Sequence, residues 1–113
     1  SDDNVLVQGV SGDQGAMGYF GYAYYVENSS LLNVLAVDGG SGCIVPSIET
    51  INDGSYSPLS REMFIYVNNS SMDRPEVRDF IEFYMNNAGE LAEEVGYVGL
   101  SAADYQSQLD QLN

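Results

Sequence analysis

Short runs of apolar residues predict three β-strands along the chain. The runs cover residues 16–20, 34–37 and 63–67. The first run lies in a stretch rich in glycine and tyrosine, where missing Cβ atoms let another backbone come close. The second run is entirely apolar, as strands buried in an α/β sheet tend to be, and the third is aromatic and β-branched. We therefore expect the strand over residues 16–20 to be the core around which the other elements are arranged.

Helical spacing and turn residues predict helices between and after these strands. The predicted helices cover residues 1–12, 22–28, 46–54, 73–95 and 101–112. A short strand is the alternative for the first of them, because its apolar run is too short for the period to decide. Pro46 suits a first helical turn, and Gly54 suits the left-handed position that ends a helix. A strand, a helix and a strand over residues 16–37 would make a βαβ-like unit.

The longest predicted helix has the clearest start signal. Asp73 can cap it, and Glu76 follows three residues later, as in a capping box. Apolar residues then recur at three- and four-residue steps and form one stripe. Gly89 lies within this stripe, which leaves open whether the segment is one helix or two. Ser101 and Asp104 repeat the capping pattern at the start of the last helix.

The acidic composition restricts the kinds of partner that the chain can bind. The 113 residues contain 17 acids, three arginines and no lysine or histidine, so the formal net charge is −14. Such a charge repels nucleic acid and anionic lipid, and we expect neither as a partner. Two interpretations of the acidity stay open: adaptation to a salty medium, or a solvated acidic surface. No apolar run approaches the roughly 20 residues of a membrane span.

The residues needed for enzyme chemistry are scarce. Histidine and lysine are absent, and no pair of carboxylates stands out from the general acidity, so we expect no catalytic residue, metal site or cofactor. Cys43 is the single cysteine, and we expect it to be a buried or half-buried inert thiol, because the chain has no histidine or lysine to lower its pKa. The glycine-rich segment Asp38–Gly42 lacks the spacing of a phosphate-binding loop and is expected to be a plain connector.

Arg61 is the one cation with a candidate binding role. In a chain with so few cations, each arginine is a candidate partner for an anion or a carboxylate. We expect Arg61 to form a salt bridge with one of the many acids, and a contact with a bound anion is the alternative.

Six segments together resemble a known family. The chain resembles the C-terminal part of the phosphate-binding protein of bacterial and archaeal phosphate ABC transporters. Each segment stands in family order, and the set covers nearly the whole chain. The matching segments are Asp2–Val10, Gly15–Tyr25, Pro46–Tyr56, Leu59–Val67, Arg78–Tyr84 and Val95–Leu100.

The resemblance implies a partial α/β fold of the type II periplasmic-binding-protein class. In this family two α/β lobes close on the ligand, and strands cross between them. Residues 1–60 would be part of the second lobe. Residues 61–113 would be the crossing strand and the C-terminal helices of the first lobe, and the two parts would form one compact piece.

The implied function is that of an extracytoplasmic solute-binding protein, periplasmic or extracellular and membrane-associated after export. It would deliver inorganic phosphate to the permease subunits of an ABC transporter. In the family, backbone N–H groups at helix N-termini, hydroxyls, an arginine and an aspartate hold the phosphate. None of these ligands maps onto a residue of this chain. Ser11, Gly12 and Arg61 are the candidates for the edge of the cleft.

A second function from another class stays open. The chain is short and lacks the family's anion ligands, which would suit a small acidic structural or interaction domain without a ligand of its own. If the chain is instead part of a binding protein, we expect it to expose apolar surface where the rest of that protein would pack, which favours self-association.

Overall fold

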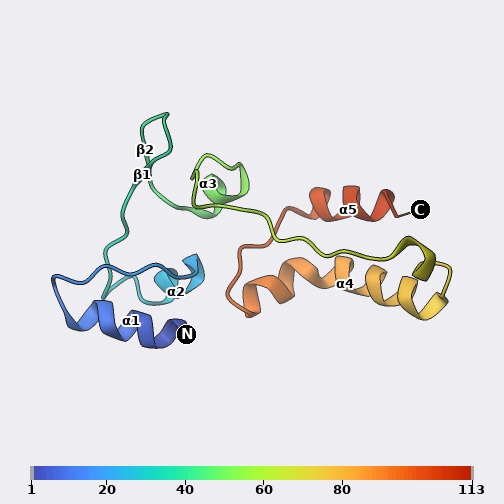
Figure 1. Cartoon of the computed structure of the whole chain (residues 1–113), viewed down its shortest axis with the longest axis horizontal. Coiled ribbons are helices and arrows are strands. Elements are labelled where there is room, and N and C mark those ends of the chain that lie inside the picture. Colours follow the sequence, from blue (N-terminus) through green and yellow to red (C-terminus); the bar gives the residue numbers. More distant parts are fainter. Residues whose placement is uncertain (1, 113) are drawn as a thin grey trace. The chain divides into compact units, whose positions relative to one another are not determined.

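The computed structural model describes residues 2–112 (Figure 1). Contacts between Cα atoms divide the chain into two compact units. The first unit runs to Arg61 and also contains Gly96–Val98. The second unit contains Glu62–Val95 and the residues from Gly99 onward. Each unit is described by itself.

The first unit begins with two adjacent helices, α1 (Asp3–Gly12) and α2 (Tyr22–Glu27). The carboxylate of Asp2 accepts a hydrogen bond from the backbone N–H of Asn4 at 3.0 Å and caps α1. The helix buries Val7. Of the two alternatives for the first apolar run, the structure therefore has the helix, because its cap is present and Val7 finds cover.

A hairpin follows, formed by β1 (Val37–Asp38) and β2 (Cys43–Ile44), which pair antiparallel. The Asp38 carboxylate accepts hydrogen bonds from the N–H groups of Gly40 at 2.8 Å and Gly42 at 3.0 Å. Both glycines have positive φ angles, 108° and 101°. The predicted connector is thus a tight loop held by Asp38. The predicted burial of Cys43 is wrong: its side chain is exposed, because it occupies the open face of a strand only two residues long.

Helix α3 (Ile48–Asn52) has a complete capping box. The Ser47 hydroxyl accepts from the Thr50 N–H, and the Thr50 hydroxyl accepts from the Ser47 N–H. Gly54 follows the helix with a φ of 74°, as predicted. Pro46 precedes the cap instead of lying in the first turn, because Ser47 supplies the start signal.

The predicted strands are largely wrong. Residues 16–20 and 63–67 are extended but belong to no strand, and only Val37 of the run over 34–37 lies in one. The βαβ-like unit is therefore absent from residues 2–112. A strand is defined by its hydrogen-bonded neighbour, and the described residues offer these segments no neighbouring strand.

In the second unit, a 3₁₀ turn, η1 (Asn69–Ser71), leads to helix α4 (Pro75–Glu94). The predicted capping box of Asp73 and Glu76 is wrong. Arg74 is the N-cap residue and Pro75 opens the helix, because its fixed φ suits the first turn. The Glu76 carboxylate pairs with the Arg74 guanidinium at 2.6 Å instead. The helix runs unbroken through Gly89, so the apolar stripe belongs to one helix.

Helix α5 (Ala102–Asp110) lies beside α4 (Figure 1). The Ser101 hydroxyl accepts from the Asp104 N–H at 3.2 Å, so the predicted cap is confirmed. Leu109 of α5 is buried, together with Ile81 and Ala88 of α4. The segment before α5 comes very close to α4: a Cβ placed on Gly99 would lie 3.0 Å from the carbonyl oxygen of Gly89. Two helices and this glycine contact form the core of the second unit.

Candidate functional site

Arg61 lies in the first unit beside a tyrosine. Its Nη1 atom donates a hydrogen bond to the Tyr19 hydroxyl, with 3.3 Å between the two atoms. Within residues 2–112 the structure pairs no carboxylate with Arg61, so the predicted salt bridge is wrong. The phenol occupies one donor of the guanidinium and neutralises none of its charge. The remaining donors are available to an anion.

Tyr56 lies near Tyr19, the residue that contacts Arg61. Partial burial, and secondarily the nearby Tyr19 phenol, raise the pKa of Tyr56 above its ordinary value. Tyr56 therefore stays protonated at neutral pH and keeps a hydroxyl donor. We call Tyr19, Tyr56 and Arg61 the Arg61 cluster. Hydroxyl and guanidinium donors together suit an oxyanion.

Sequence reasoning did not predict this cluster. Tyr19 was expected inside a buried strand, but it is 63% exposed in an extended segment. Tyr56 lies in the turn that follows α3, 37 residues further along the chain. Only the folded chain brings Tyr19 to Arg61 and near Tyr56, because Tyr19 lies far from both in the sequence.

The other two predicted cleft-edge residues lie at the end of α1. The Ser11 hydroxyl donates to the carbonyl oxygen of Gln8 at 3.2 Å, and Gly12 is the last residue of the helix. The C-terminal end of a helix carries partial negative charge, which does not attract an anion. Among the described residues, no hydrogen bond joins Ser11 or Gly12 to Arg61.

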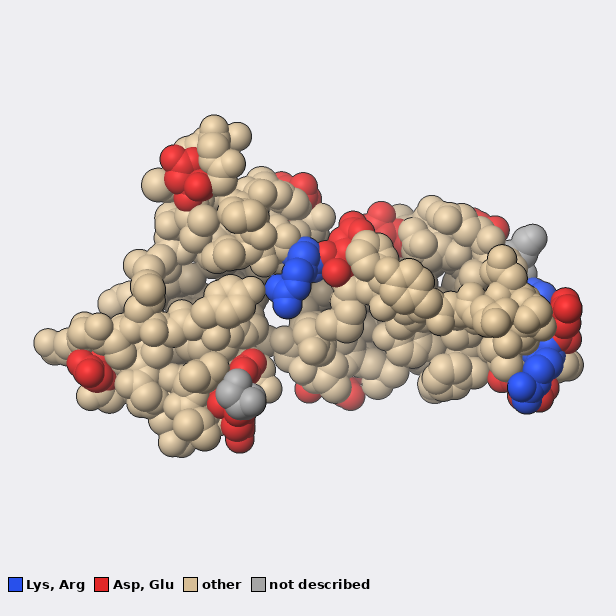
Figure 2. Space-filling view, in the orientation of Figure 1, with Lys and Arg blue, Asp and Glu red and all other residues tan. Residues whose placement is uncertain are grey.

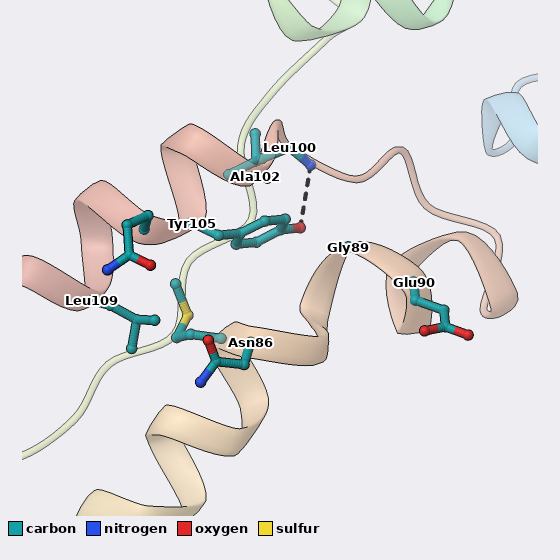
Figure 3. Close-up of a pocket in the computed structure, with 9 residues that line it drawn as sticks. Asn86, Gly89, Glu90, Leu100, Ala102, Tyr105 and Leu109 are labelled. Carbon is teal, nitrogen blue, oxygen red and sulfur yellow. Dashed lines mark hydrogen bonds between the residues drawn. The ribbon is translucent and has the colours of Figure 1, made fainter.

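The second unit contains a cavity of about 380 Å³ between α4 and α5 (Figure 3). The Tyr105 hydroxyl accepts a hydrogen bond from the Leu100 N–H at 3.2 Å across one side of it. Glu90 is its one charged lining residue, so the cavity offers no positive charge to an anion. The lining residues are Met85, Asn86, Gly89, Glu90, Leu100, Ala102, Tyr105, Gln106 and Leu109.

On the face that Figure 2 shows, acidic groups are scattered and form no continuous patch. Three of them have pKa values below the ordinary range. The N–H groups of Gly40 and Gly42 lower the pKa of Asp38, and Ser55 lowers that of Asp53 through its hydroxyl and its N–H. The backbone N–H of Glu76 and the Arg74 side chain lower the pKa of Glu76. All three carboxylates therefore stay charged at neutral pH and serve local turns or caps.

Two kinds of site are not found between residues 2 and 112. No three acids or cysteines gather as metal ligands in this range. None of the described helices has both the length and the apolar character needed to cross a membrane. Among the described residues, the hydroxyl and guanidinium donors of the Arg61 cluster have the chemistry to bind an anion.

Comparison with known proteins identifies relatives, although no family model matches the sequence. The chain is 48% identical over 105 residues to Protein SphX of Synechococcus elongatus, covering 92% of this chain and 31% of that protein. It is 40% identical to the phosphate-binding protein PstS of Staphylococcus aureus, covering 99% of this chain and 35% of PstS. The chain spans about a third of the length of the curated relatives it matches.

A solved structure is similar as well. It is the crystal structure of a possible phosphate binding protein from Planctomyces limnophilus, 42% identical, with a TM-score of 0.84. The match covers 98% of this chain and 40% of that one. It confirms the predicted fold class, a partial α/β fold of the type II periplasmic-binding-protein kind. The segments over residues 16–20 and 63–67, which form no strand here, are therefore compatible with an α/β protein. The homologues of this chain are thus phosphate-binding proteins, and the chain corresponds to their C-terminal part.

Proposed function

We propose that this chain acts in the binding of inorganic phosphate, as part of a solute-binding protein that delivers phosphate to an ABC permease. The observation that carries the proposal is the match to PstS, whose name states phosphate binding, over 99% of this chain. The protein works outside the cytoplasm, periplasmic or extracellular and associated with the membrane through its permease. It is a carrier and not an enzyme, in keeping with its lack of histidine and lysine.

Within this chain, Arg61 is the residue that we assign to the edge of the phosphate cleft. Its guanidinium is free of carboxylates among the described residues, and Tyr19 orients it. Ser11 and Gly12 remain predictions for the same edge of the cleft. The dipole of α1 does not favour an anion there, because both residues lie at its C-terminal end. Residues 1–60 are proposed as part of the second lobe and residues 61–113 as the return to the first. Most phosphate ligands then come from the part of the relatives that this chain does not match.

The test is titration calorimetry with inorganic phosphate, at low and high salt. One sample is this chain, and the other is a chimera in which the chain replaces the matching C-terminal part of Staphylococcus aureus PstS. We expect the chimera to bind phosphate and the chain alone not to bind it. Binding by the chain alone would place the whole site within these 113 residues. A folded chimera that does not bind phosphate would overturn the proposal.

The Arg61 assignment has its own test in the same chimera. Replacing Arg61→Gln removes the charge but keeps an amide donor, and should weaken phosphate binding by about tenfold to a hundredfold, as loss of a charge-assisted hydrogen bond does. Arg74→Gln is the matched control, because Arg74 already pairs with Glu76 in the other unit. Equal affinities for the Arg61→Gln, Arg74→Gln and unchanged proteins would remove Arg61 from the site.

A second candidate function rests on one observation. No polar or charged side chain is buried among the described residues, so this part of the chain contains no enclosed anion site. That property suits a small acidic structural or interaction domain. Its exposed apolar side chains, such as Met17 and Tyr66, favour self-association. Light scattering over a range of concentrations should show oligomers, and a monomer at every concentration would count against this self-association.

A further inference from the structure

Three Asn-x-Ser tripeptides occur in the sequence, and this is the acceptor pattern for N-linked glycosylation. They begin at Asn28, Asn68 and Asn69. In this pattern the side-chain nitrogen of the asparagine receives the sugar, and an attached oligosaccharide is bulky enough to require a surface position. The three tripeptides are alike in sequence, so the local structure around each asparagine decides which of them can react.

Asn28 is held at the end of α2. Its Nδ2 atom donates a hydrogen bond to the carbonyl oxygen of Tyr24 at 2.9 Å, and the residue is half-buried. Its backbone N–H bonds to the last turn of the same helix. The nitrogen that would receive the sugar is therefore already bonded, and it becomes available only when the end of α2 opens.

Asn68 has the opposite arrangement. It is exposed and precedes the 3₁₀ turn η1. Its Oδ1 atom accepts hydrogen bonds from the Ser70 N–H at 3.0 Å and from the Ser70 hydroxyl at 2.7 Å. Its Nδ2 atom makes no hydrogen bond within residues 2–112. The two donors on Oδ1 draw electron density from the amide group, which makes an Nδ2 proton easier to remove.

Asn69 lies one residue further on, inside η1, and is also exposed. Residues two positions apart in a 3₁₀ helix, which has three residues per turn, point to different sides. Accordingly, no hydrogen bond joins Asn69 to Ser71 in the described part of the chain. Of the three asparagines, Asn68 is the one that combines exposure, an available amide nitrogen and a bonded serine hydroxyl.

We propose that Asn68 is a site of N-linked glycosylation, modified by an oligosaccharyltransferase that uses a lipid-diphosphate-linked oligosaccharide. A bond forms between Nδ2 and the anomeric carbon of the first sugar. The bond between that carbon and the diphosphate oxygen breaks, and the lipid diphosphate leaves with the electron pair. One Nδ2 proton passes to a carboxylate base of the transferase. The proposal rests on the extracytoplasmic location in the proposed function, because this transfer takes place outside the cytoplasm.

The test incubates the folded chimera with Staphylococcus aureus PstS, a single-subunit oligosaccharyltransferase and a polyprenyl-diphosphate-linked oligosaccharide. Mass spectrometry of proteolytic peptides measures the glycan on each asparagine over time. We expect transfer to Asn68 to be at least about tenfold faster than transfer to Asn28, because Asn28 reacts only after local opening. Free peptides of residues 24–34 and 64–74 are the control and should react at similar rates, because neither is folded. Equal rates at Asn28 and Asn68 in the folded chimera, or no glycan at Asn68 although its peptide accepts one, would overturn the proposal.

Two serine variants assign the glycan to one asparagine. Ser70→Ala removes the hydroxyl of the Asn68 tripeptide and keeps that of the Asn69 tripeptide, whereas Ser71→Ala does the reverse and is the matched control. Ser70→Ala should slow transfer to Asn68 at least about tenfold, and Ser71→Ala should leave it unchanged, because the acceptor pattern needs the hydroxyl two residues after the asparagine. Equal transfer to Asn68 in the two variants would contradict the role of the Ser70 hydroxyl.

Phosphate binding by the same chimera is a separate measurement. Loss of glycan transfer with phosphate binding intact would overturn the glycosylation site alone. Loss of phosphate binding with glycan transfer intact would overturn the proposed function alone.

Discussion

At the scale of single residues, two facing glycines hold the segment before α5 against α4. A Cβ on Gly99 would lie 3.0 Å from the Gly89 carbonyl oxygen and 3.3 Å from the Gly89 Cα. These are backbone atoms of a helix and cannot move aside alone. A Cβ on Gly89 would meet only the Tyr105 ring, at 3.4 Å. A side chain is therefore excluded at Gly99 by the backbone of α4, whereas Gly89 has room for one.

Substituting each glycine should change stability in opposite directions. Gly99→Ala should lower the free energy of unfolding by about 1–3 kcal/mol, the usual cost of overpacking. Gly89→Ala should raise it by roughly 0.5–1 kcal/mol, because alanine is the better residue inside a helix. Urea denaturation of both variants measures the changes. A neutral or stabilising Gly99→Ala would mean that the close approach to α4 does not exist in solution.

Asp38 gives a prediction about pH. The N–H groups of Gly40 and Gly42 hold its pKa below the ordinary value. A carboxylate with a lowered folded pKa stabilises the folded state above its unfolded pKa of about 3.9, and this contribution is lost as the pH falls through the lower folded value. NMR should find its midpoint below about 3.9. In Asp38→Asn the amide signals of Gly40 and Gly42 should lose their pH dependence. A midpoint at the ordinary value would contradict the loop geometry.

At the scale of elements, local start and stop signals set the short helices. The hydroxyls of Ser47 and Thr50 satisfy N–H groups at the start of α3, and Gly54 follows its end. The sequence predicted this helix and the one that follows Ser101, because caps and glycine turns act within a few residues. The predicted start of α4 was wrong. Asp73 and Glu76 matched a capping box, but the helix begins at Pro75, whose fixed φ suits the first turn.

Removing the hydroxyl of Ser47 tests the α3 cap. Ser47→Ala should destabilise the chain by about 1 kcal/mol, the typical cost of losing an N-cap. Ser47→Thr keeps a hydroxyl at the same place and is the matched control. Urea denaturation compares the two variants. If both variants lowered the free energy of unfolding equally, the Ser47 hydroxyl would not cap α3.

At the scale of the whole molecule, like charges oppose folding. The formal net charge is −14, and the described residues contain one carboxylate–guanidinium pair, between Arg74 and Glu76. The last turn of α4 carries Glu93 and Glu94 and no base, so the helix dipole adds to the repulsion there. Salt shortens the range of such repulsion from about 10 Å at 0.1 M to about 3 Å at 1 M.

Stability should therefore rise with salt. Raising sodium chloride from 0.1 M to 1 M should increase the free energy of unfolding by on the order of 1 kcal/mol, the size of one close exposed charge interaction in water. Thermal unfolding in a series of salt concentrations measures it. The double variant Glu93→Gln and Glu94→Gln should be more stable at low salt and less dependent on salt. A salt response that is flat in both proteins would leave the solvated acidic surface as the explanation of the composition.

The sequence by itself determined the helices, the cap at Ser101, the acidic composition and the likeness to phosphate-binding proteins. Each of these depends on residues close in the sequence, on composition or on the order of sequence segments. All three are properties of the unfolded chain as well. The tertiary structure alone decided which apolar runs become strands, that Cys43 is exposed, and that Arg61 meets Tyr19. Strand pairing and the Arg61 cluster join residues far apart in the sequence, and such contacts exist only when the folded chain brings both partners together.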